Sequence, residues 1–600
     1  MKTIVLMDLP YDIKVDGLII PLSGAAEKML LDKKISCMPP DRYKSSINID
    51  HKLVNDIRKI WSAEAGRNKF KETFFDKNYH VSLTRIAEDW LLGTTPYCES
   101  IINALDFIDL LNAVIKKEVP DKIVLISRDW EKIAICKQLK NCEILDVGID
   151  KEKRIRKLIK HKLVLYRSLA RRIRHKKNAK PDEKKTILSF AAKRLRVIDS
   201  KTRNVSDVMF DYFRDKDNYR LIIADFSAKS HEGRDVSYVP IEWYLRFGDM
   251  RFAKNAANDM KKLWEKSKKS SRTVLAFRGF DIWGIVVPRL DFFFSHFLER
   301  VFMEMRMFEN AILEERPALI INDDAPNIRG MEIAAVARKR GVRSLALQHG
   351  GMIGNWITNI LSKNEADQKN AYSCPLPDFI TSHGMSDKRF MVRTTKINSN
   401  VIFNVGDPQY DFLLRAALDE GGIRSEFKLA RTKTILFAPS TDNPSHEKSR
   451  IADMVFSAAN GLDAQLVVKL HPREREAALY AELSKKTGNA IFIDQRRRDT
   501  HKLIAISDIV ISNYSSVNLE AVLLKKPSIM VDPFGKYKNI NYYGAILNVS
   551  SEQKLAKVLK RILDGKLEMP RKKFIENFYF KTDGMACKRI ADVVYRLVKK

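Results

Sequence analysis

Apolar residues in this chain gather in short runs, each closed by glycine or polar residues, and stretches with apolar residues at helical spacing separate the runs. Period and length of this kind predict β-strands alternating with α-helices. Strands joined through helices pair in parallel, so the pattern predicts an α/β fold built on parallel sheets. The runs that carry this prediction are 3–9, 122–127, 185–193, 219–226, 318–324, 344–350, 378–384, 401–408, 433–440, 466–472, 506–512 and 527–532.

Six hundred residues exceed what one hydrophobic core accommodates, so the chain is expected to hold several domains. The changes in pattern predict five parts. They are an appended N-terminal α/β domain (1–148), a basic helix with a polar linker (149–185), a second α/β domain (186–411), a bridging segment (412–432) and a third α/β domain (433–600).

The segment 151–185 differs from its surroundings in charge, with sixteen Lys and Arg residues against three acidic ones. Leu158, Ile159 and Leu163 begin a partial apolar face, which is typical of a basic amphipathic helix. Three interpretations stay open: a solvated interdomain helix, docking of residues 151–180 on an anionic membrane surface, and nucleic-acid binding. The last is disfavoured because no recognised nucleic-acid module surrounds the segment.

Composition narrows the class of protein further. Hydrophobic residues make up 45% and charged residues 30% of the chain, which is typical of globular proteins, and the net charge of +32 favours anionic partners. The six cysteines show neither disulfide nor metal-site spacing, and the apolar runs are too short to span a bilayer. We therefore expect a cytoplasmic protein, with peripheral attachment to the inner face of the cell membrane through the basic segment.

The last quarter of the chain holds the strongest candidate site. The run ending at Lys469 is followed by His471 and Pro472, and the run ending at Ser512 is followed by Ser515 and Ser516 at the start of a helical stretch. The first N–H groups of a helix have no internal partner, so this arrangement predicts an anion site. Glu520, about one turn later, is placed to accept hydrogen bonds from sugar hydroxyls. Ser440 and Thr441 end another strand, and all eight residues are predicted to bind a nucleotide-activated donor.

Polar residues also follow the strands of the second α/β domain. His349 is a candidate general base because histidine titrates near neutrality, and Gly350 and Gly351 let a ligand approach closely. Together with His383 these glycines are candidates for binding an acceptor. The adjacent pair Asp323–Asp324 offers an alternative base. Each of these positions also has a plain structural interpretation, as a solvated or hydrogen-bonded loop residue.

The order LQHGG, DFITSHG, NVGDPQYD, ILFAPS, KLHP and SDIVISNYSSVNLEAVLLKKP, spread over about residues 186–560, resembles the GT-B-fold transferases of surface-polymer synthesis. The families in question are the CDP-glycerol glycerophosphotransferases of teichoic acid synthesis, bacterial polysialyltransferases and capsule polysaccharide transferases. The resemblance implies two Rossmann-like domains facing a cleft. It also implies donor binding by His471, Pro472, Ser515, Ser516 and Glu520, and a base at His349 or at Asp323–Asp324.

The predicted function is therefore an inverting, metal-independent transfer of a sugar or polyol phosphate from a CDP-, CMP- or UDP-linked donor to a hydroxyl of a glycan or lipid-linked acceptor. No cofactor is expected. Two alternatives remain: a non-hydrolysing UDP-sugar 2-epimerase, which shares the GT-B fold, and a non-catalytic nucleic-acid-binding or scaffold protein that the high charge would explain.

Overall fold

The computed structural model covers the chain as two compact units. One comprises residues 1–26, 34–405 and 587–600, and the other comprises 27–33 and 406–586. The longer stretches that the structure describes are 2–8, 17–22, 101–146, 183–190, 202–225, 235–270, 276–322, 327–348, 374–411, 419–430, 432–440, 445–471, 477–493, 500–513, 515–535 and 541–599. Shorter described pieces are 11, 26, 29–30, 33, 35–38, 40, 43, 75–76, 79, 81–83, 86–87, 90, 194–196, 231–232, 414, 474 and 537.

A four-stranded sheet opens the first unit, in the order β2-β1-β5-β6, with every neighbouring pair parallel. Its strands are apolar along most of their length because helices and loops cover both faces of a parallel sheet. The strands are β1 (Thr3–Met7), β2 (Leu18–Pro21), β5 (Lys122–Ser127) and β6 (Cys142–Asp146), with helices α5 (Ile102–Glu118) and α6 (Trp130–Cys136) between β2 and β6.

This sheet is fastened to the rest of the first unit by a buried ion pair. Glu131 on α6 accepts two hydrogen bonds of 2.7 Å from the guanidinium of Arg289, and both side chains are almost fully buried. Arg289 lies on α10 (Trp283–Phe292). One continuous hydrophobic core surrounds the pair and includes Trp90, which stacks on Phe292. The N-terminal sheet is therefore packed into the first unit rather than tethered to it.

An eight-stranded sheet forms the centre of the first unit, in the order β11-β12-β10-β7-β15-β16-β17-β18. All neighbours are parallel except β11 and β12. Its strands are β7 (Lys185–Phe190), β10 (Tyr219–Asp225), β11 (His231–Glu232), β12 (Val236–Pro240), β15 (Leu319–Asn322), β16 (Ser344–Ala346), β17 (Phe379–Ser382) and β18 (Ile402–Asn404). Its helices are α8 (Val205–Phe210), α9 (Phe247–Ser270), α11 (Leu298–Glu315), α12 (Ile328–Lys339) and α14 (Met385–Thr395).

The aromatic stretch Phe280–Phe302 is largely a buried helix. It runs through α10, a π-helical turn over Phe293–Phe297, and the start of α11. Phe293, Phe294 and Phe297 are buried in the core. The extra residue per turn in a π-helix is a distortion that close packing of large rings can stabilise.

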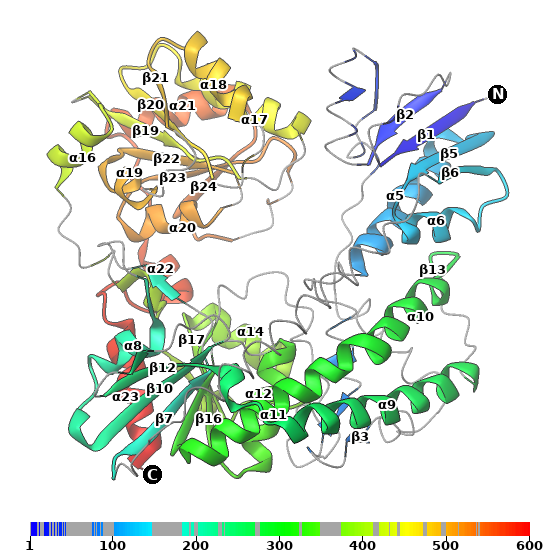
Figure 1. Ribbon diagram of the computed structural model, residues 1–600. Coiled ribbons are helices and arrows are strands. Elements are labelled where there is room, and N and C mark those ends of the chain that lie inside the picture. The colour runs from blue at the N-terminus through cyan, green and yellow to red at the C-terminus, as the bar shows by residue number, and fades with distance from the viewer. Residues whose placement is uncertain are drawn as a thin grey trace. The chain divides into compact units, whose positions relative to one another are not determined.

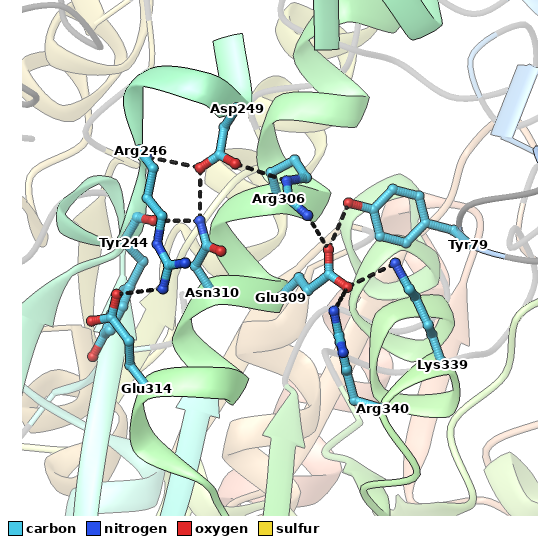
Figure 2. A network of polar contacts seen from close by, with 10 residues as sticks. All are labelled: Tyr79, Tyr244, Arg246, Asp249, Arg306, Glu309, Asn310, Glu314, Lys339 and Arg340. Carbon is cyan, nitrogen blue, oxygen red and sulfur yellow. Dashed lines mark hydrogen bonds and ion pairs between the residues drawn. The ribbon is translucent and has the colours of Figure 1, made fainter. Parts of the chain in front are cut away.

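Figure 2 shows a network of charged side chains that ties α9, α11, α12 and the N-terminal region together. Glu309 on α11, fully buried, accepts from Tyr79 at 3.2 Å, from Arg306 at 2.6 Å and from Lys339 at 2.7 Å, and it also pairs with Arg340. Burial would raise the pKa of Glu309, but the hydrogen bonds and charges of Lys339 and Arg340 outweigh burial and lower it.

The same network continues to the start of α9. Asp249 accepts from Arg306 at 2.8 Å and from both Asn310 and the backbone N–H of Arg246 at 2.7 Å. Arg306 therefore bridges two buried carboxylates, as Figure 2 shows. A buried charge needs partners of this kind, because an unpaired one costs several kcal/mol.

The last helix, α23 (Ala586–Lys599), returns to the first unit, which includes Cys587–Lys600. The ring of Tyr595 packs edge-on against Phe213 and Tyr219, and its hydroxyl donates to Asp215 at 2.8 Å. Arg589 donates to the carbonyl of Val405 at 2.7 Å. The chain therefore passes between the units near residues 405–406 and near 586–587, in addition to the short segment 27–33 that also belongs to the second unit.

The second unit is built on a six-stranded, fully parallel sheet in the order β21-β20-β19-β22-β23-β24, with helices on both faces (Figure 1). The strands are β19 (Thr434–Phe437), β20 (Gln465–Lys469), β21 (Ala490–Ile493), β22 (Ile509–Ser512), β23 (Ser528–Val531) and β24 (Ile546–Val549). The helices are α16 (Glu420–Glu426), α17 (Ser445–Ala459), α18 (Ala477–Lys486), α19 (Thr500–Ile506), α20 (Ser516–Leu523), α21 (Glu552–Leu563) and α22 (Lys572–Phe578).

Alternate residues of its central strand face the two layers of helices. Ile435 and Phe437 join a core with residues of α17 and α21, while Leu436 joins a core with residues of α16 and α19. The period of two in a strand explains why an uninterrupted apolar run was required here. The predicted α/β fold class is confirmed: each unit is built on a parallel or largely parallel sheet, and the first unit has an additional N-terminal parallel sheet. Among the helices within the described residues, none is long and apolar enough to cross a membrane.

Candidate functional site

The topology of the second sheet singles out one place for a ligand. From β19 the chain goes to β20 and β21 on one side and then crosses back to β22 on the other side. Ligands of open parallel sheets bind beyond the carboxyl ends of the strands at such a reversal. Ser440 follows β19 and Asn513 follows β22, and the backbone N–H of Ser440 donates to the side chain of Asn513 at 2.6 Å. This bond joins the two loops on either side of the reversal.

Two of the predicted anion-binding residues start helix α20. Ser515 is the N-cap, with extended backbone, and its hydroxyl accepts from the N–H of Val517 at 3.3 Å. Ser516 is the first helical residue and is exposed. An exposed hydroxyl beside the positive end of a helix suits an anion. Thr441 and Pro472, predicted for the same site, lie outside the described residues.

His471 and Lys469 differ in their surroundings, although they are two residues apart. His471 follows β20 and is exposed. The side chain of Lys469, the last residue of β20, is buried, and its ammonium group donates to the carbonyl of Leu470 at 2.7 Å. Direct contact between Lys469 and a phosphate would require this side chain to move.

A buried ion pair fixes the turn that carries His471. The ammonium group of Lys448, in the first turns of α17, lies 2.9 Å from the carboxylate of Glu474, and both side chains are buried. The backbone N–H of Glu474 donates to the carbonyl of His471 at 2.9 Å. The sequence offers no local signal for this pair, because its members lie on different elements.

Glu520, predicted to hold a ribose, is almost buried on α20. One of its oxygens lies 3.2 Å from Nε2 of His501, on the neighbouring helix α19. His501 was not among the residues selected from the sequence. The carboxylate has a second oxygen, so this pairing leaves capacity to accept from a ligand.

In the first unit, the described part of the predicted acceptor site is a hydrogen-bonded corner at the ends of β16 and β17. Gln348 accepts from the N–H of His383 at 2.8 Å and donates to Asp387 of α14 at 2.7 Å. His383 is buried. The other residues predicted for this site, His349, Gly350, Gly351, Asp323 and Asp324, lie outside the described residues.

Buried carboxylic acids also gather near the carboxyl ends of β10 and β12. Glu242 directly follows β12, Glu304 lies on α11 and Glu332 on α12, and all three are buried. Burial is the main cause that raises the pKa of Glu242, to about 7, and that of Glu332 well above the usual range. In the part of the chain that the structure describes, no three metal-ligating side chains gather into a metal site.

Comparison with known proteins identifies one family over the second half of the chain. Residues 299–596 match the family described as CDP-Glycerol:Poly(glycerophosphate) glycerophosphotransferase. A teichoic acid glycerol-phosphate primase from Bacillus spizizenii is 31% identical over 134 residues, which are 22% of this chain and 34% of the primase. The chain therefore spans about a third of the length of this curated relative.

Solved structures with detectable similarity include the UDP-GlcNAc 2-epimerase from Methanocaldococcus jannaschii, with 13% identity, a TM-score of 0.42, and coverage of 69% of this chain and 99% of the epimerase. The wall teichoic acid polymerase TagF has 17% identity and a TM-score of 0.39, with coverage of 75% and 98%. The family match includes the carboxyl ends of β15 and β16 and nearly all of the second unit. The match to the CDP-glycerol:poly(glycerophosphate) glycerophosphotransferase family therefore covers residues 299–596, just under half of the 600-residue chain.

Proposed function

We propose that this protein transfers glycerol phosphate from CDP-glycerol to a hydroxyl group of a teichoic-acid-type acceptor. The family match over residues 299–596 supports the reaction class, and the segment similar to a glycerol-phosphate primase supports glycerol phosphate as the transferred group. The observation that carries the proposal is the arrangement of Ser440, His471 and Ser515. They end three adjacent strands at the reversal of the second sheet, where a nucleotide diphosphate would bind.

In this proposal the acceptor hydroxyl attacks the phosphorus atom that bears glycerol. The bond from that phosphorus to the oxygen bridging the two phosphates breaks, and CMP leaves with the bonding electron pair. His471 and the N-terminus of α20 stabilise the negative charge on the phosphates, which is the main demand of phosphoryl transfer. The proton of the attacking hydroxyl passes to His349 or to the Asp323–Asp324 pair, as predicted from the sequence.

Binding to the donor nucleotide tests the first half of the proposal. A thermal-shift series with CDP, CMP, UDP and GDP is expected to raise the melting temperature most with the cytidine nucleotides, because ligands stabilise the folded state that binds them. A larger shift with UDP or GDP than with CDP would contradict CDP-glycerol as the donor and would favour the epimerase or another sugar transferase.

Turnover tests the second half. His471→Ala is expected to lower the rate of CMP release from CDP-glycerol about 100-fold or more, since loss of one charge-stabilising contact in a transition state costs that much. The melting temperature should stay close to that of the wild type because His471 is exposed. A matched control is Lys486→Gln, which removes an exposed positive charge on α18 of the same unit and should leave turnover unchanged. A fully active His471→Ala protein would rule out this role.

A further inference from the structure

His501 contacts the carboxylate that the proposed function assigns to the nucleotide. Its Nε2 atom lies 3.2 Å from Glu520 Oε2, and 42% of the His501 side-chain surface is exposed against 10% for Glu520. The contact therefore joins a partly exposed imidazole to a carboxylate that is mostly inside the protein. Such a partner restrains the rotamer of Glu520, which has three side-chain torsions to lose.

The packing of α19 explains why His501 faces Glu520 while the next residue, Lys502, does not. Helix α19 packs beside both α16 and α20. His501 is on the side of α20, while Lys502 is paired with Glu426 of α16 at 3.0 Å. On the inner side, the buried phenol of Tyr410 lies near Glu520: burial, then Tyr579 and then Glu520 raise the pKa of Tyr410.

The chemistry of the pair suits a diol. A carboxylate accepts hydrogen bonds at both oxygens, and a ribose presents two neighbouring hydroxyl donors. With Oε2 restrained by His501, the remaining lone pairs of Glu520 are held in one orientation. Restraining a binding group before the ligand arrives strengthens binding, because less freedom is lost on association.

We propose that His501 is a positioning residue that orients Glu520 toward the ribose hydroxyls of the donor nucleotide, so that this pair makes the site selective for ribonucleotides. The inference rests on the proposed function, since it takes the ligand to be a cytidine diphosphate. Beyond the proposed function, the inference adds a selectivity for ribose over deoxyribose and names His501 as the residue that supports this selectivity.

The test compares three ligands on the full chain by isothermal titration calorimetry: CDP, 2′-deoxy-CDP and 3′-deoxy-CDP. The wild type should bind CDP about tenfold or more tightly than at least one deoxy analogue, because hydrogen bonds to a charged acceptor are strong and a buried carboxylate left unpaired is costly. His501→Ala should weaken CDP binding about fivefold while the affinity for that analogue changes little, so the preference shrinks.

Two further variants separate positioning from a general structural role. His501→Gln keeps an N–H donor near the position of Nε2 and should restore most of the preference for CDP. Lys502→Gln changes the next residue on the same helix, whose partner is Glu426, and should leave the preference unchanged. Glu520→Gln should lose the preference altogether, which identifies the carboxylate as the group that contacts the sugar.

The outcomes distinguish this inference from the proposed function. Equal weakening of all three ligands in His501→Ala, or an unchanged preference, would overturn the role of His501. A wild type that binds CDP and both deoxy analogues equally would also overturn it, while leaving donor binding intact. A wild type that binds none of the three would overturn the proposed function as well.

Discussion

At the scale of single residues, Glu242 is a carboxylic acid whose surroundings favour its neutral form. The pKa of Glu242 is raised to about 7, and burial is the main cause. The negative charges of Asp225 and Glu304 raise this pKa further, while a backbone hydrogen bond and the charge of Arg329 lower it. The folded state therefore holds a proton on Glu242 that the unfolded state loses near its ordinary pKa, between 4 and 5. Folding stability falls as the pH rises through this window and reaches its full loss above pH 7.

Glu242→Gln is therefore expected to stabilise the protein at pH 8 and to have little effect at pH 4.5. A shift of this size corresponds to roughly 3 kcal/mol at high pH, because one pKa unit is worth about 1.4 kcal/mol. Urea unfolding of both proteins at the two pH values measures the difference. Equal effects of the substitution at pH 4.5 and pH 8 would show that folding does not raise the pKa of Glu242.

Some residues of the candidate site could be selected from the sequence, and others could be found only in the structure. Those that directly follow a strand, such as Ser440, His471 and Ser515, could be selected from the sequence because the carboxyl ends of parallel strands lie at one edge. His501 could not be selected from the sequence, because its contact with Glu520 depends on how α19 packs beside α20. The stretch THKLIAI that contains it has no motif that marks a ligand. The burial of Lys469 could not be foreseen either, since a lysine at a strand end is usually exposed.

At the scale of secondary structure, the central strands of the second unit were predictable and its two edge strands were not. β7, β19 and β22 are uninterrupted apolar runs because helices cover both of their faces. The edge strands β21 and β24 were not selected, because they are short and partly exposed and therefore lack that pattern. The π-helical turn at Phe293–Phe297 has no signature in the apolar spacing, which continues through it.

The buried pair of Lys448 and Glu474 connects α17 with the turn after β20, so we expect it to matter for both stability and turnover. Lys448→Met should destabilise the second unit by about 3 kcal/mol, because it leaves the Glu474 carboxylate buried without its cation. The double change Lys448→Met with Glu474→Gln should recover part of that loss. Chemical unfolding measures both, and additive effects of the two substitutions would contradict a coupled pair.

At the scale of the whole molecule, the net positive charge predicts binding to anionic membrane surfaces. With a net charge of +32 and the basic segment at 151–180, we expect it to float with vesicles that contain anionic lipid and to remain unbound with neutral vesicles. Binding should weaken as salt is raised, since each exposed cation is screened. Deletion of 151–180, which lies outside the described residues, should abolish flotation, and retention by the deleted protein would assign binding to another surface.

Because α23 follows residues 406–586 in sequence but belongs to the first unit, those residues are inserted between two parts of the first unit and do not form a C-terminal half. A fragment running from 406 to 600 would contain α23 without the rings of Phe213 and Tyr219. The apolar face of α23 would then be exposed and is expected to promote aggregation. Recombinant work on nucleotide binding should excise 406–586 instead. If the donor binds as proposed, exchange of residues 406–586 between relatives, with α23 of the host kept, is expected to transfer the choice of donor.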